Sequence, residues 1–245
     1  MKIITFISLT LLSGAIAGAL LGLINQGIVE PFIDKAIGIE TQREISTGKI
    51  VDNTQQSQYR VWQKEGEIVA ATIMGMSLAS LFGVVFAYSR NSMPASDNKT
   101  KALILASLMF FVLFLVPALK YPANPPAVGN PSTIYYRENL FIGFIAISGF
   151  STLVLALLYR RLGSKDRLKM KTAFSLIYAA IMAIAYLVFP SNPDKVTIPT
   201  DLIISFRIAS VFTMGVFWGL LGVIFGMFWN KFKPHETNKE IATSV

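Results

Sequence analysis

The sequence predicts an all-α integral membrane protein whose six transmembrane helices form three repeated in–out–in hairpins. Three observations lead to this fold class. Hydrophobic residues make up 53% of the 245-residue chain and charged residues only 15%. The apolar residues fall into six stretches, and prolines and aromatic–arginine pairs mark these stretches at regular places. A soluble domain of this length needs far more charged surface, so a single soluble core is excluded.

Each apolar stretch approaches or exceeds the roughly 20 residues with which a helix crosses the hydrocarbon of a bilayer. Lipid cannot satisfy open backbone groups, and the stretches lack strict alternation, so we expect helices and not strands. The stretches cover residues 3–28, 68–88, 102–119, 140–159, 172–189 and 208–229.

The first stretch shares two features with a secretory signal peptide. Lys2 supplies a positive start, and Ala-Ile-Ala at 15–17 resembles a cleavage site. The apolar run nevertheless continues past the roughly 7–15 residues of a signal core. We therefore expect a retained transmembrane helix.

A proline ends each outward stretch, and an aromatic–arginine pair precedes each return stretch. Proline ends helices, and an arginine beside an aromatic residue anchors a helix at the membrane interface. Because both marks occur in all three pairs of stretches, they predict an internal repeat of hairpins 1–89, 101–161 and 170–231. The first hairpin contains a long acidic loop. These hairpins form a single membrane domain over 1–245, of which 232–245 is a polar cytoplasmic tail. The marks are Pro31, Pro117 and Pro190, and Tyr59-Arg60, Tyr136-Arg137 and Phe206-Arg207.

The distribution of charge predicts the orientation. Six spans place both termini on one side, and that side holds 13 of the 22 Lys and Arg residues. By the positive-inside rule both termini are cytoplasmic, in a multi-pass protein of the plasma membrane. Six of the 13 lie in one short loop that either sets topology or also binds lipid headgroups: Arg160, Arg161, Lys165, Arg167, Lys169 and Lys171. This placement explains the formal charge of +8 without nucleic acid.

Ten of the 14 acids fall on the opposite, outer side. Acids are tolerated outside a membrane, but a cluster also raises the local concentration of cations at the entrance of a pore. The most promising pair is Glu30 and Asp34, which share a helix face if the chain restarts as helix after Pro31; Glu40 and Glu44 repeat the spacing. Their carboxylates predict a divalent-cation site to which Asn25 and Gln26 add neutral oxygens. Alternatively, these acids form ion pairs with Lys35, Arg43, Arg60, Arg137 or Arg207.

Residues 121–132 read YPANPPAVGNPS, in which four prolines stiffen an extended chain. This segment is either a rigid connector or a plug over the outer mouth of the bundle. The residues predicted at the gate or outer mouth are Asn25, Gln26, Pro117, Tyr121, Pro122, Asn124, Pro125, Pro126, Arg60, Arg137 and Arg207.

Two ridges of glycine at close helical spacing predict helix packing through direct backbone approach. They bring the first and last helices together, or they form a dimer surface. The ridges consist of Gly14, Gly18 and Gly22 in the first helix and Gly215, Gly219, Gly222 and Gly226 in the last.

Enzyme signatures are lacking: the sequence holds no Walker A loop, dinucleotide fingerprint, HExxH pair or nucleophile elbow. It has no cysteine, and its single histidine, His235, lies in the tail. We therefore expect no catalytic residues and no permanently bound cofactor.

Residues 30–36 (EPFIDKA), 117–129 (PALKYPANPPAVG) and Tyr136-Arg137 resemble the CbtA family of predicted cobalt transporter subunits. The resemblance runs from the first through the fourth helix and more loosely to the end. It implies cobalt as the substrate and a small one-span companion subunit that bears histidines. Because cobalt favours nitrogen ligands beside oxygen, either that partner supplies imidazole or the hydrated ion passes the carboxylates.

The sequence thus favours a membrane transporter subunit that takes up a divalent cation such as cobalt. A second hypothesis is a non-transporting structural or assembly subunit of a larger membrane complex. A third is transport of an anion attracted by the three arginines. The expected partners are the lipid bilayer, the companion subunit and possible further copies of the chain.

Overall fold

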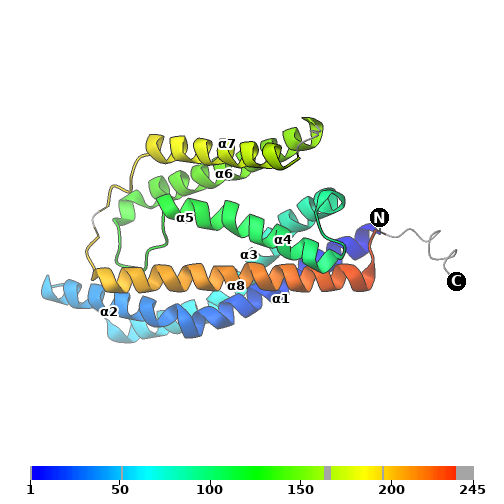
Figure 1. Cartoon of the computed structure of the whole chain (residues 1–245). Coiled ribbons are helices and arrows are strands. Elements are labelled where there is room, and N and C mark those ends of the chain that lie inside the picture. Colours follow the sequence, from blue (N-terminus) through cyan, green and yellow to red (C-terminus); the bar gives the residue numbers. More distant parts are fainter. Residues whose placement is uncertain (1, 51, 163–166, 195, 236–245) are drawn as a thin grey trace.

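The computed structural model describes residues 2–50, 52–162, 167–194 and 196–235, and this part of the chain is helical with no strand. Lys165 of the predicted basic loop and residues 236–245 of the predicted tail lie outside the described residues. Figure 1 shows the helices in order. They are α1 (Ile3–Ile28), α2 (Glu30–Ser46), α3 (Asn53–Ser89), α4 (Asn98–Phe110), α5 (Val116–Lys120), α6 (Ile134–Leu162), α7 (Arg167–Val188) and α8 (Thr200–Phe232), with short 3-10 turns at Arg90–Ser92 and Pro131–Thr133.

The described residues contain six helices long and apolar enough to cross a membrane, as predicted. They are α1, α3, the run Asn98–Lys120, α6, α7 and α8. Because successive spans alternate in direction, the molecule has two ends. At one end of the molecule the backbone N–H of Lys2 donates to the carbonyl of Pro234 at 2.8 Å. The start of α1 and the end of α8 therefore meet there. The opposite end carries α2 and is called the α2 end below (Figure 1).

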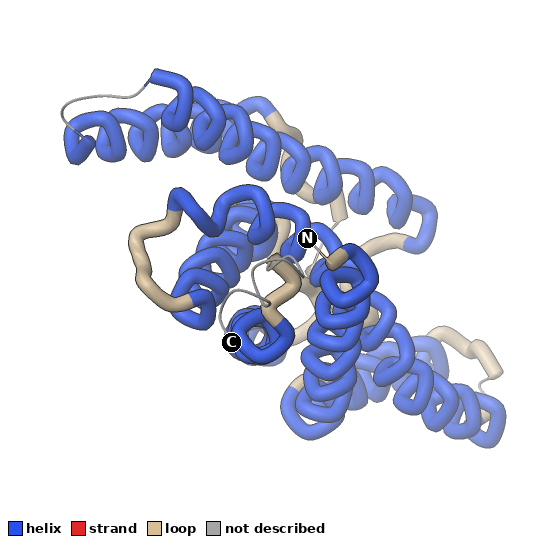
Figure 2. Tube along the Cα trace, turned by 90° about the vertical axis from the view of Figure 1, so that its right-hand side faces the viewer, coloured by secondary structure: helices blue, strands red, loops and turns tan. Residues whose placement is uncertain are grey.

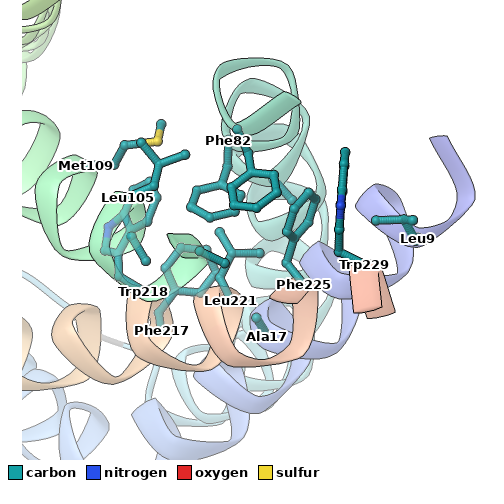
Figure 3. Close-up of a cluster of buried hydrophobic side chains, with 14 of the residues drawn as sticks. Leu9, Ala17, Phe82, Leu105, Met109, Phe217, Trp218, Leu221, Phe225 and Trp229 are labelled. Carbon is teal, nitrogen blue, oxygen red and sulfur yellow. The ribbon is translucent and has the colours of Figure 1, made fainter. Parts of the chain in front are cut away.

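The main core lies between α1, α3, α4 and α8. Its buried side chains come from all four helices, as Figure 3 shows for Leu9, Phe82, Leu105 and Trp218. Aromatic rings fill much of this volume: the Phe225 ring packs edge-on against Phe82 at a centroid distance of 5.0 Å. Edge-to-face pairs of this kind add stability beyond the area they bury.

The glycine ridge of α1 packs against α3. A Cβ added at Gly14 or Gly18 would overlap backbone atoms of Gly75 or Ala71, and one at Gly22 would lie 2.8 Å from the Cα of Ile68. The close backbone approach is therefore as expected, but the partner is neither the last helix nor a second copy of the chain.

The ridge of α8 packs against α4. A Cβ at Gly222 would lie 2.9 Å from the Cβ of Ala106, and one at Gly226 would lie 2.6 Å from the Cα of Lys99. Gly215 has only the Phe110 ring nearby, and Gly219 has open space. The two ridges thus fasten α3 to α1 and α4 to α8, while α1 and α8 contact each other through other residues.

Helices α6 and α7 form a pair that stands apart from this core, as the end-on view in Figure 2 shows. The pair contacts the rest of the bundle mainly where α6 meets residues 111–120. One buried contact there is the hydroxyl of Ser148, which donates to the carbonyl of Val112 at 2.6 Å and lies 2.8 Å from the Tyr178 hydroxyl.

Pro117 does not end its helix as predicted. The run continues through a π-helical segment, Phe111–Leu115, into α5, where Pro117 occupies the first turn and is buried. The N–H of Val116 bonds to the carbonyl of Phe111, and Pro117 has no N–H to offer to Val112. The carbonyl of Val112 is thereby left for Ser148, which explains how the proline is accommodated inside the span.

The three predicted hairpins differ in how their helices pack. In the first, α1 and α3 lie together along their length; in the second, α6 meets the preceding run at the π-helical segment and α5. In the third, α7 packs against α6, and α8 packs against α1 and α4. The structure therefore shows six spanning helices without showing three equivalent hairpins.

The predicted acidic loop of the first hairpin is mostly helix. Pro31 begins α2 in its first turn, and α3 begins at Asn53, where the Asp52 side chain accepts hydrogen bonds from the backbone N–H groups of Thr54 and Gln55. Proline is tolerated in a first turn, whose N–H groups have no partner within the helix. Pro31 is thus a helix start, and Tyr59-Arg60 lies two turns inside α3 instead of before it.

Candidate functional site

Two carboxylates of α2 face α3 at the α2 end of the bundle. Glu30 and Asp34 are one turn apart in α2, as anticipated for a chain that resumes as helix at Pro31. The side chain of Glu30 is only 7% exposed, whereas that of Asp34 is 47% exposed. A buried carboxylate requires a compensating charge or hydrogen bonds.

Arg60 and Lys64 of α3 supply that compensation with matching one-turn spacing. Nη2 of Arg60 bonds to Oε2 of Glu30 and lies 2.9 Å from Oδ1 of Asp34. Nζ of Lys64 lies 2.7 Å from Oδ2 of Asp34. We call these four residues the α2–α3 charge cluster. The cluster joins α2 to α3 across 30 residues of sequence.

The cluster also sets the protonation of Asp34. Its partial burial alone would raise the pKa of the Asp34 carboxyl, but hydrogen bonds and charges from Lys64 and Arg60 outweigh burial and lower that pKa. Asp34 therefore stays ionised in the folded protein across the physiological range.

The other two predicted metal ligands lie further along α2. Glu40 is exposed, and Oε1 of Glu44 pairs with Nζ of Lys49 at 2.7 Å. The described residues hold no group of three or more His, Asp or Glu side chains arranged to hold a metal ion together. The ion pair with Arg60, which was the alternative interpretation of Glu30 and Asp34, is present.

Asn25 and Gln26 lie at the end of α1, next to α3. The amide of Gln26 donates to the backbone carbonyl of Lys64 at 2.9 Å and so ties α1 to α3. Asn25 faces the carboxylate of Glu67, which lies one turn after Lys64 in α3. The Oδ1 atom of Asn25 and the Oε2 atom of Glu67 are both buried and accept no hydrogen bond.

The proline-rich segment is fastened to two other elements. The hydroxyl of Tyr121 donates to the carbonyl of Pro190 at 2.6 Å. Arg207 of α8 donates to the carbonyl of Ala123 at 3.3 Å and to Oδ1 of Asn124 at 2.7 Å. Within the segment, Pro125 is buried, Pro122 is half-buried and Pro126 is exposed. The segment is therefore folded against the ends of α7 and α8.

Arg137 contacts an acid from the connection between α7 and α8. Its Nε lies 3.0 Å from Oδ2 of Asp194, which also accepts from the hydroxyl of Thr133 at 2.6 Å and the N–H of Asn130 at 3.1 Å. The bond from Thr133, followed by that from Asn130 and the charge of Arg137, lowers the pKa of Asp194.

The three connections at the α2 end form one interlocked layer, which we call the outer cap because it lies beyond the main core of the bundle (Figure 1). Arg43 of α2 donates to the carbonyl of Thr197 at 2.6 Å, and the hydroxyl of Thr197 donates to the carbonyl of Ala127 at 3.2 Å. Beneath these bonds lies a small apolar core made of Ala36, Val128, Ile198, Leu202 and Ile203. Hydrogen bonds and a shared apolar core thus join the three connections at this end.

Each of the three arginines has a different acceptor in this layer: carboxylates of α2 for Arg60, Asp194 for Arg137 and neutral oxygens for Arg207. Sequence reasoning did not identify Lys64 or Asp194 as partners. The spacing of Arg60 and Lys64, which equals that of Glu30 and Asp34, was the one signal available for the cluster.

A protein-family model described as a probable cobalt transporter subunit (CbtA) matches residues 3–230. The chain belongs to the CbtA family. The match includes all six spanning helices and the outer cap, so CbtA covers nearly the whole chain and not only the motifs in residues 30–36 and 117–129. No curated protein and no solved structure matches the chain. Membership in CbtA makes it a multi-pass membrane protein of a transporter-subunit family.

Proposed function

We propose that the chain is the membrane subunit through which a divalent cation such as cobalt is taken up. The observation that carries the proposal is the α2–α3 charge cluster, in which two carboxylates meet two basic side chains at one end of a spanning bundle. Family membership supports transport of cobalt. The basic side chains of Arg60 and Lys64 pair with these carboxylates and are released when a cation takes their place.

The charge distribution supports the orientation that uptake requires. Lys and Arg residues concentrate at the end that holds Lys2 and the close of α8, which we assign to the cytoplasm together with both termini. The α2 end then faces outward at the plasma membrane. A divalent cation that moves inward gains about 2 × 2.3 kcal/mol per 100 mV of inside-negative potential, so uptake needs no catalytic domain.

Within this function the predicted residues take distinct roles. Glu30 and Asp34 receive the ion, and Glu40 and Glu44, further along α2, attract it. The outer cap, with the proline-rich segment and Arg207, covers the outer mouth and must loosen to admit the ion. A histidine-bearing one-span companion, which the family resemblance implies, would supply nitrogen ligands; a further copy of the chain is the other proposed partner.

One observation favours the second candidate function, a non-transporting assembly subunit. Arg60 and Lys64 already neutralise Glu30 and Asp34, which suits a purely structural clamp between α2 and α3. Uptake measurements separate the two functions.

We expect cells that lack their own copy of the chain to accumulate cobalt again when they express it. Glu30→Ala and Asp34→Ala should each lower the initial rate by about tenfold, because affinity at oxygen-ligand sites follows the number of charged ligands. Accumulation is measured by mass spectrometry of washed cells. Glu65→Ala, on an exposed position of α3, is the matched control and should keep the wild-type rate. A rate that does not respond to expression of the chain would contradict transport and favour the assembly subunit.

A further inference from the structure

An apolar groove lies between α5 and α7, in the half of the bundle nearer the α2 end. Its volume of about 370 Å³ is within the range of small-molecule sites. The floor consists of the buried side chains of Val116, Phe144 and Met182. The walls include the exposed side chains of Leu119, Tyr186 and Leu187. The groove therefore opens sideways from the spanning helices, toward the hydrocarbon of the membrane.

The groove lies at the joint between the α6–α7 pair and the rest of the bundle. Both α5 and α7 pack against α6, and the floor of the groove belongs to the small apolar core that these helices share. Apolar side chains around a groove gain dispersion contacts from an apolar group that enters it. The bilayer supplies such a group at this depth, because an acyl chain reaches the groove without crossing a polar layer.

A positive charge lies at the rim of the groove. Lys120 is the last residue of α5, and its Nζ lies 4.5 Å from the centre of the Tyr186 ring, which itself lines the groove. None of the ion pairs among the described residues includes Lys120. A lysine at the end of a spanning helix holds its ammonium at the level of the lipid headgroups. The charge at the rim is thus free to pair with a phosphate from the membrane.

The rim keeps its shape without the Lys120 ammonium. The hydroxyl of Tyr121 donates to the carbonyl of Pro190 at 2.6 Å and so links the end of α5 to the chain that follows α7. The Tyr121 ring also packs edge-on against Phe144 in the floor, at a centroid distance of 5.8 Å. A substitution of Lys120 that removes only its charge is therefore expected to leave the groove intact.

We infer that the groove binds an acyl chain of an anionic phospholipid whose phosphate pairs with Lys120. The apolar floor accepts the chain, and the ammonium at the rim selects the headgroup. A zwitterionic lipid offers the same chain, but its own positive group competes with Lys120 for the phosphate, so the site prefers a headgroup with a net negative charge. This lipid site is separate from the α2–α3 charge cluster, and it does not depend on the proposed transport.

The test is native mass spectrometry of the purified full-length chain, titrated with phosphatidylglycerol or with phosphatidylcholine of the same acyl chains. We expect wild type to bind one phosphatidylglycerol about fivefold more tightly, the effect of one lysine near an anionic lipid. Lys120→Gln should remove this preference, and Lys120→Arg should keep it. Lys35→Gln is the matched control and should also keep it, because Nζ of Lys35 lies 6.0 Å from the Phe32 ring but away from the groove.

A second variant tests the groove itself. Ala183 lines the groove and is exposed, so the indole of Ala183→Trp would fill the space without disturbing the core of the bundle. We expect this variant to bind both lipids several-fold more weakly than wild type. Ala180→Trp is the matched control, because Ala180 is an exposed residue of α7 that does not line the groove.

Equal affinities of wild type for the two lipids, or an unchanged preference in Lys120→Gln, would overturn the site. Lipid binding that is unaffected by Ala183→Trp would also overturn it. The same spectra report the oligomeric state. If a second copy of the chain covers the groove instead of a lipid, wild type appears as a dimer that Ala183→Trp converts to a monomer with no change in lipid binding, and the lipid site is wrong.

Discussion

Gly18→Leu is expected to destabilise the protein by at least about 3 kcal/mol, the upper end of the usual effect of overpacking a core. Even a single Cβ at Gly18 would overlap the carbonyl of Ala71 and lie 2.9 Å from the Cα of Thr72. These are backbone atoms of α3, so they cannot turn away as a flexible side chain would. Unfolding by SDS titration of the purified chain in mixed micelles measures the change.

The control is Gly219→Leu in α8, because nothing lies within 4 Å of a Cβ at that position. We expect this variant to unfold close to the wild-type midpoint. Equal midpoints for Gly18→Leu and wild type would show that α1 and α3 are not in backbone contact, and the packing described above would be incorrect.

Arg60→Gln is expected to lower stability by about 3–5 kcal/mol in the absence of divalent cations, the usual result of removing one partner of a buried ion pair. Glu30 would remain buried, with Lys64 at 4.0 Å as its remaining positive neighbour. The same SDS titration, carried out with a chelator, measures the loss.

A double variant tests whether the loss comes from the stranded charge. Glu30→Gln with Arg60→Gln should be more stable than Arg60→Gln alone, because no buried carboxylate is then left without a partner. If the two substitutions simply add, Glu30 and Arg60 are not coupled, and the α2–α3 charge cluster does not hold α2 in place.

The six spans were predictable because hydrophobicity over about 20 residues is a strong signal. α2 was not, since Glu30–Ser46 is polar enough to resemble a loop in a search for apolar stretches. Its helical state depends on the contacts of Ala36 with the outer cap and of Glu30 with Arg60. Pro117 was also misjudged, because the hydroxyl that satisfies the carbonyl of Val112 comes from Ser148, 36 residues away.

The glycine ridges predicted close packing but not the partner helix. Ala71, Gly75 and Ala79 form a small-residue ridge at four-residue spacing in α3, and this ridge matches that of α1. The information was in the sequence, although hydrophobicity alone does not reveal it.

The candidate site was predictable in its location but not in its pairing. Glu30 and Asp34 had several basic partners available, and only the fold brings Arg60 and Lys64 to them. Long-range pairs of this kind depend on tertiary packing.

The position of the ion itself tests the cation site most directly. Anomalous scattering at the cobalt edge, recorded from crystals of the full-length chain grown with cobalt chloride, locates the metal without ambiguity. We predict a peak between Glu30 and Asp34, with the Arg60 side chain turned away from Glu30. A peak confined to other residues, with Arg60 still bonded to Glu30, would contradict the site.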